Sequence, residues 1–344
     1  MHISIDQILL APNEILRTYA AELGISLNPN QLKVNAIINP KALERYQQLW
    51  MPSSRMVHYS QSVNLINIAK SNSIWLHNIE NMEDKTEMKY GYEPLQKFIN
   101  SNKAIKLWNF FDNKCNGLSE KIKYHINGHG HSLLNNTYIF CICEFDPQVP
   151  VGTVEMWKEY ARLKEGDGVS VKINPIPMRQ ISDAVGANSY PVIYEDKDAL
   201  FTLLEDTSER ILDNNKLFLE LSEEEIFSFM WSVVEQFVYG SKDPFFKNEK
   251  EWRVVYNPIV RGENQIMKAV DENSGKDKPK NFALPLQDVP GLTGLTIKDF
   301  LSEVLIPDGK NAMEIKSNLE QTNQDLQLGL SDSSIKIIDL PISY

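Results

Sequence analysis

The sequence predicts an α+β fold, in which short apolar strands alternate with longer amphipathic helices. Of the 344 residues, 42% are hydrophobic and 24% are charged, which is typical of a globular chain with a sizeable core. Several apolar runs have the length of buried strands. The segment Glu223–Tyr239 instead repeats apolar residues at helical spacing. Together these patterns favour a central sheet with helical insertions.

The first 52 residues are expected to form an N-terminal helical extension. One helix is predicted from Asn13 to Leu23, because Gly24 is a favourable residue immediately after a helix end. The pair Asn39-Pro40 supplies an N-cap and a proline at the first helical position, so a second helix is predicted after it. No strand pattern is found in this part of the sequence.

Residues 53–344 are expected to form the main α+β domain. A flexible insertion is expected around residues 261–288, which are polar and rich in glycine, asparagine and lysine. Eight segments have strand patterns: Met56–Tyr59, Ile74–His77, Tyr138–Phe145, Gly168–Ile173, Tyr190–Tyr194, Trp252–Tyr256, Glu303–Ile306 and Ser334–Ile338.

The composition predicts a cytoplasmic protein without a membrane partner. The chain has no stretch of about 18 consecutive apolar residues, as a transmembrane helix requires. Its start lacks the basic region and the cleavage site of a secretory signal. Only three cysteines are present, which suits buried free thiols in a reducing compartment. The net charge of −11 argues against a generic nucleic-acid binder, whose surface is usually basic.

Two local features leave a further class of function open. Between Lys97 and His131 the sequence is rich in lysine and aromatic residues, which favours either a solvated helical face or a surface for a phosphate-bearing partner. The same stretch holds His125, His129 and His131, separated by two glycines. We expect a solvated loop there and no bound metal, but these features would also suit a metal- or phosphate-dependent nucleic-acid enzyme.

Familiar catalytic signatures are absent from the sequence. It contains no glycine-rich phosphate loop and no Gly-x-Ser-x-Gly elbow. What remains are polar residues on predicted core strands, above all His58 and Glu251. A carboxylate at the start of a buried strand must be solvated, paired or functional. Because Arg253 shares the face of Glu251, a structural ion pair is one interpretation and a catalytic carboxylate the other.

An ordered set of motifs between residues 55 and 310 resembles an uncharacterised bacterial family of unknown function. Its members begin with His-Tyr-Thr and end with Glu-x-Glu-Trp-Arg. Here Ser60 replaces the usual threonine and keeps a hydroxyl. Glu83 and Lys85 stand where asparagine and proline are usual, so the role of that acidic segment differs. The matching residues are Val57-His58-Tyr59-Ser60, Ser73-Ile74-Trp75-Leu76, Met82 to Glu87, Trp157, Tyr160, Gly166, Gly168, Val169 and Glu249-Lys250-Glu251-Trp252-Arg253.

The layout of these motifs is also similar, more distantly, to the ADP-ribosyltransferase superfamily. That resemblance implies a split central β-sheet with an ADP-ribosyltransferase-like core and NAD as the substrate. It implies that His58 and Ser60 hold the nicotinamide ribose and that Tyr160 packs on the nicotinamide ring. Tyr59 is an alternative to Tyr160 as the aromatic residue. It implies a catalytic role for Glu251, His58 and Tyr160. The residues it assigns to NAD binding are His58, Tyr59, Ser60, Trp157 and Arg253.

The resemblance implies NAD-dependent ADP-ribosyl transfer or NAD hydrolysis, in a bacterial defence or toxin protein such as one acting against phage. Breaking the nicotinamide–ribose bond develops an oxocarbenium ion, as in glycoside cleavage. A fixed carboxylate such as Glu251 stabilises that charge. NAD or another nucleotide is the expected partner, and the acceptor, protein or nucleic acid, stays open. The alternative is a non-catalytic binding or assembly protein on the same scaffold.

Overall fold

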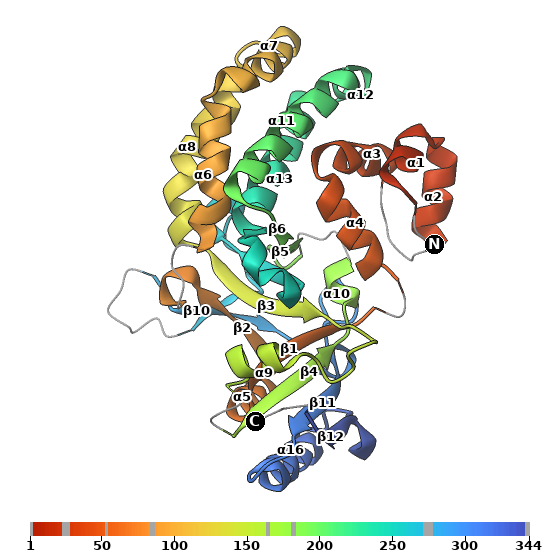
Figure 1. Cartoon of the computed structure of the whole chain (residues 1–344), viewed down its shortest axis with the longest axis vertical. Coiled ribbons are helices and arrows are strands. Elements are labelled where there is room, and N and C mark those ends of the chain that lie inside the picture. The colour runs from red at the N-terminus through yellow and green to blue at the C-terminus, as the bar shows by residue number, and fades with distance from the viewer. Residues whose placement is uncertain are drawn as a thin grey trace.

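A computed structural model of the chain describes residues 3–22, 28–51, 54–82, 87–162, 166–179, 184–270 and 278–340 (Figure 1). The α+β class is confirmed. The helices are α1 (Ile5–Leu10), α2 (Asn13–Glu22), α3 (Pro29–Ile38), α4 (Pro40–Leu49), α5 (Ser62–Ser71), α6 (Glu87–Ile99), α7 (Ile105–Lys114), α8 (Leu118–Asn135), α9 (Val154–Glu159), α10 (Ile176–Arg179), α11 (Lys197–Asp213), α12 (Asn215–Glu220), α13 (Glu223–Tyr239), α14 (Pro258–Arg261), α15 (Ile297–Phe300) and α16 (Ala312–Leu326).

A ten-stranded mixed sheet forms the centre of the molecule, with β12-β11-β4-β1-β3-β2-β10-β9 in order and β8 and β5 branching from β3. Only β11 and β12 run parallel within it, and β6 and β7 make a separate small pair. The strands are β1 (Met56–Gln61), β2 (Ser73–Asn78), β3 (Tyr138–Glu144), β4 (Gly168–Ile173), β5 (Ala187–Pro191), β6 (Ile193–Tyr194), β7 (Ser241–Lys242), β8 (Glu251–Tyr256), β9 (Lys268–Val270), β10 (Asn281–Pro285), β11 (Leu301–Pro307) and β12 (Ile335–Ile338).

The sheet forks at β3. Strand β8 pairs along one edge of β3, from Tyr138 to Cys143. On the other edge, β2 pairs only near Ile139 and β1 only near Cys143. Cys141 therefore lies between the two pairings, where β1 and β2 diverge.

Each face of the sheet is covered by its own apolar core. The long helices α6, α7, α8, α11 and α13 form a lobe on one face, where Ile139, Tyr190 and Val255 join their buried side chains. Helices α5 and α16 cover the other face, which carries alternate residues of the same strands, such as Phe140 and Val254. We call these the lobe face and the opposite face.

The N-terminal helices pack directly on the sheet. Arg45 of α4 donates to the carboxylate of Glu144 (Nη2 to Oε1, 2.7 Å) and to the backbone carbonyl of Glu251 (3.1 Å). Tyr46 donates to the carbonyl of Ser189 and meets the ring of Trp252 edge-on, with centroids 5.0 Å apart. Helix α4 is thereby fixed against β5 and β8.

The expected histidine loop is instead part of an 18-residue helix, α8, so that prediction was wrong. The two glycines that suggested a loop have a packing role in one case: a Cβ on Gly130 would lie 2.1 Å from the hydroxyl oxygen of Tyr92 on α6. Glycine at 130 therefore leaves room for the Tyr92 hydroxyl between α6 and α8. A glycine in a helix interior costs about 1 kcal/mol relative to alanine.

One further expectation differs from the structure. Residues 261–288, expected to form a flexible insertion, contribute β9 and β10, and β10 pairs with β2 in the sheet. Residues 271–277 lie outside the described part of the chain. In the basic stretch beginning at Lys97, most lysines are exposed on helices, as a solvated helical face would be, and some form surface ion pairs within the lobe, for example Lys103 with Glu205 and Lys121 with Glu223. No described helix is long and apolar enough to span a membrane.

Candidate functional site

Strand β8 begins with a buried ion-pair network formed by Glu87, Lys242, Glu249, Glu251 and Arg253. Every residue of β8 is buried, and Arg253 is 0% exposed. The Arg253 guanidinium lies 3.0 Å from Glu251 and 2.7 Å from Glu87. It also donates to the carbonyl of Tyr239 at 2.8 Å. Buried charges require such partners.

Lys242 on β7 joins the three carboxylates of this network. Its ammonium nitrogen lies 2.7 Å from Glu249, 2.9 Å from Glu87 and 3.2 Å from Glu251. Glu249 also accepts from the hydroxyl of Tyr160 at 2.5 Å. With three carboxylates against two cations, the network has one excess negative charge.

The two carboxylates of the Glu-x-Glu motif have pKa values shifted in opposite directions. Burial alone would raise the pKa of Glu251, but the charges of Arg253 and Lys242 outweigh it and hold that pKa at about 2. Burial raises the pKa of Glu249, which Lys242 only partly opposes. Carboxylates separated in this way can divide acid and base roles between them.

Four of the predicted site residues share the lobe face with Glu251. The register Val57–Cys143–Glu251 across β1, β3 and β8 places these three side chains on one face, and Tyr59 follows at the next position of that face. Trp157 of α9 packs edge-on against Tyr59, with centroids 5.4 Å apart, and its indole donates to the carbonyl of Val151. Arg253 and Tyr160 belong to the same group because Arg253 pairs with Glu251 and Tyr160 donates to Glu249.

His58 and Ser60 point to the opposite face. The half-buried ring of His58 packs on Phe140, with centroids 4.5 Å apart. Its Nδ1 lies 2.9 Å from the carbonyl of Cys141, which can only accept, so Nδ1 carries the proton. This bond caps the carbonyl left between β1 and β2 at the fork. Burial lowers the pKa of His58 to about 4, so the ring is neutral at pH 7.

Ser60 is buried and accepts from the side-chain amide of Asn64 at 3.1 Å. The structure therefore separates His58 and Ser60 from Glu251 by the thickness of the sheet. Residues 83–86 of the acidic segment lie outside the described residues, while Glu87 falls within the ion-pair network.

A cavity of about 240 Å³ adjoins the network on the lobe face. Tyr59, Cys143 and Glu249 line it, together with residues 149–153, Glu155 and Met156. Glu251 does not line it. The carboxylate of the motif that faces open space is therefore Glu249, two residues before the one that the sequence singled out.

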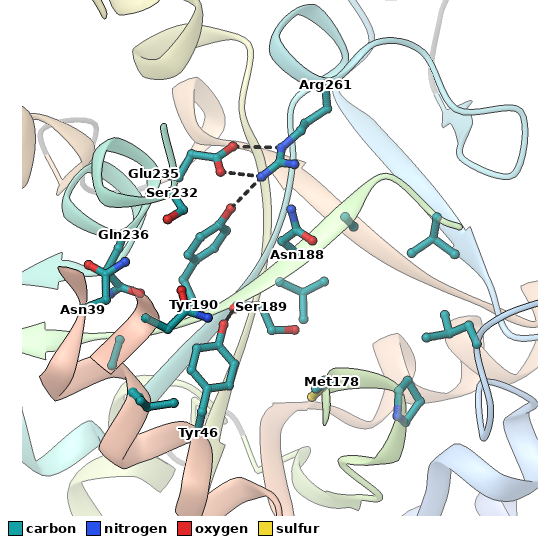
Figure 2. Close-up of a pocket in the computed structure, with 18 of the residues that line it drawn as sticks. Asn39, Tyr46, Met178, Asn188, Ser189, Tyr190, Ser232, Glu235, Gln236 and Arg261 are labelled. Atoms are coloured by element: carbon teal, nitrogen blue, oxygen red, sulfur yellow. Dashed lines mark hydrogen bonds and ion pairs between the residues drawn. The ribbon is translucent and has the colours of Figure 1, made fainter. Parts of the chain in front are cut away.

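A larger cavity of about 350 Å³, which we call the central pocket, surrounds the outer edge of β5 (Figure 2). Its walls come from α3 and α4, from Pro177, Met178 and Val185, from β5, from α13, from Ile74, Val254 and Arg261, and from Leu284, Leu292, Leu295 and Phe300. Asn188 and Tyr190 line it from one face of β5 and Ser189 from the other. Nothing in the sequence analysis predicted this pocket.

Glu235 and Arg261 form a paired charge in the wall of the central pocket (Figure 2). Glu235 is 2% exposed and Arg261 contacts both of its carboxylate oxygens, with Nε to Oε1 at 2.9 Å. The hydroxyl of Tyr190 lies 3.5 Å from the Arg261 guanidinium. Burial raises the pKa of Glu235, and the charge of Arg261 opposes that rise. One feature of the sequence could have indicated this pair: Glu235 interrupts the apolar face of α13.

Two other polar side chains of the pocket, those of Asn39 and Asn188, have no hydrogen-bond partner among the described residues. The hydroxyl of Ser232, in contrast, donates to the carbonyl of Phe229 at 2.7 Å. Figure 2 shows Asn39, Asn188 and Ser232 around the same cavity as Tyr46 and Met178. Within the described residues, no group of three or more histidine, cysteine or acidic side chains could hold a metal ion.

Residues 156–254 match a protein family described only as a protein of unknown function, DUF2971. The matched segment runs from α9 into β8 and includes Tyr160, Glu249, Glu251 and Arg253. This supports the resemblance to an uncharacterised family over that part of the chain. No curated protein matches the chain, and no solved structure matches it.

Proposed function

We propose that the chain is a non-catalytic binding protein whose central pocket holds a small, neutral molecule. The observation that carries this proposal is a ligand-sized cavity built from several separate parts of the chain around the edge of β5. Small-molecule sites commonly have volumes of about 300–1,000 Å³ and combine apolar walls with a few polar groups. Leu43, Met178 and Phe300 supply apolar walls here.

The charge distribution defines the class of ligand. The only cation that lines the central pocket among the described residues, Arg261, is occupied by Glu235. A phosphate or carboxylate in the depth of the pocket would therefore lose its hydration without gaining a free cation. The amides of Asn39 and Asn188 both donate and accept, which suits a neutral edge such as that of a nucleobase or an amide.

A nucleoside and amide panel tests this proposal by thermal melting. Neutral members are expected to raise the melting temperature, since a ligand at 100 times its Kd adds about 2.7 kcal/mol to the free energy of unfolding. Their monophosphates should stabilise less. Asn188→Trp should fill the cavity and abolish the effect, while Asn318→Trp on the exposed face of α16 should retain it. A panel without effect on the wild type, or an equal effect on Asn188→Trp, would contradict the proposal.

NAD cleavage on an ADP-ribosyltransferase-like core is the second candidate. It is favoured by the gathering of Tyr59, Trp157 and Tyr160 beside a cavity that Glu249 lines. In this reaction the nicotinamide–ribose bond breaks with both electrons going to the nicotinamide nitrogen. Water or an acceptor then adds to the ribose carbon and gives its proton to a carboxylate. His58 and Ser60, on the opposite face, take no part in this arrangement.

An NAD-consumption assay tests the second candidate. Glu249→Gln should reduce turnover by a factor of about 100 or more, because glutamine cannot stabilise the cationic transition state. Glu93→Gln, in an exposed ion pair with Lys197, should have no effect. Wild-type protein that neither consumes NAD nor is stabilised by it would rule this candidate out.

A further inference from the structure

Helix α8 brings His125 and His129 together on one face. They are four residues apart, so they lie one turn from each other along the helix. Their ring centroids are 4.9 Å apart and the rings are inclined by 24°. The same spacing allows the two histidines of the His-Glu-x-x-His motif to bind one zinc ion.

Helix α13 holds these two rings in place without occupying their nitrogens. Phe227 meets the His125 ring edge-on at 4.9 Å, and Trp231 lies 6.1 Å from His125 and 5.9 Å from His129. Neither imidazole has a hydrogen-bond partner among the described residues, unlike His58 and His77.

We propose that His125 and His129 form a binding site for a divalent transition-metal ion such as Cu²⁺, Ni²⁺ or Zn²⁺. Imidazole is a preferred ligand of all three ions. Two protein ligands leave the remaining positions to water, so the affinity is lower than that of a closed four-ligand site. This proposal is independent of the function proposed for the central pocket.

The surroundings permit an ion to bind. Lys121 lies one turn before His125 on the same face of α8, but its ammonium group is 2.5 Å from Glu223 and 5.4 Å from the Phe227 ring centroid. Its charge is thus compensated within the lobe. Tyr124 is 78% exposed, which places this stretch of α8 at the surface.

Titration with Cu²⁺, followed by tryptophan fluorescence, tests the site. A copper ion on the histidine pair would lie close to Trp231, so we expect saturable quenching of part of the emission. Because the chain has six tryptophans, Trp231→Phe identifies that part and should remove it. Titration calorimetry with Ni²⁺ measures binding without any fluorophore.

The decisive variant is His125→Gln/His129→Gln, since glutamine is a good helix former. It should weaken Ni²⁺ and Cu²⁺ binding at least about tenfold, which is about 1.4 kcal/mol. Circular dichroism and melting would show that it is folded. His77→Gln, whose ring is bound to Asn281 on another strand, should bind as the wild type does. Wild type that binds neither ion, or a folded double variant that binds equally well, overturns the proposal.

Discussion

Glu251→Gln is expected to lower the free energy of unfolding by about 3–5 kcal/mol at neutral pH. Glutamine keeps the volume of the side chain but not its charge. Arg253, which has no solvent access, then keeps only Glu87 as a charged partner. Lys242 similarly loses one of its three carboxylates. Thermal and denaturant melting should show a decrease of several degrees in Tm.

The pH dependence of this loss follows from the lowered pKa of Glu251. A carboxyl group with a folded pKa of about 2 stabilises the protein fully above its unfolded pKa of about 4.3, and loses that contribution as the pH falls toward 2. The difference between wild type and Glu251→Gln should therefore shrink below about pH 4. Glu93→Gln, an exposed carboxylate change, should cost less than about 1 kcal/mol. Equal stability of wild type and Glu251→Gln at pH 7 would mean that the network is not a structural element.

Most of the sheet could be predicted because a buried strand is recognised from a short run of consecutive apolar residues. The apolar runs at Tyr138 and Trp252 form β3 and β8, and the capping residue Ser222 begins α13 with a complete capping box. Gly130 of α8 was misleading because the space that it leaves is filled by Tyr92 of α6, which is distant in sequence. Glycine occurs both in closely packed helices and in flexible loops, so its presence alone does not distinguish them.

The site was harder to predict because it depends on the register between strands. Alternation alone relates His58 to Tyr59, but only the pairing with β3 shows that His58 and Glu251 lie on opposite faces. The sequence likewise could not show that Glu249, and not Glu251, lines the cavity beside the network. The central pocket could not be predicted from the sequence for a further reason. Several separate segments meet there, and each of them is an ordinary helix, strand or loop by itself.

Arg261→Met is expected to leave Glu235 as a buried, unpaired carboxylate in the wall of the central pocket. Glu235 then either remains charged at a high energetic cost or takes up a proton. Protonation costs about 1.4 kcal/mol for each pH unit above the ordinary glutamate pKa of about 4.3, which limits the loss to about 3–4 kcal/mol at pH 7. The hydroxyl of Tyr190, which lies 3.5 Å from the Arg261 guanidinium in the wild type, carries no charge and cannot replace it.

This limit gives the Arg261→Met variant a distinctive pH dependence. Removing Arg261 raises the folded pKa of Glu235 further above the unfolded one, so the stability of the variant falls more steeply than that of the wild type as the pH rises. The loss relative to wild type should be at most about 1 kcal/mol at pH 5 and should grow through pH 7. Adding Glu235→Gln to Arg261→Met should restore most of the stability and remove the pH dependence, because no charge is left to neutralise. Chemical denaturation of both variants at pH 5 and pH 8 measures their free energies of unfolding. A loss of stability in Arg261→Met that does not change with pH would show that Arg261 acts through packing and not through its charge.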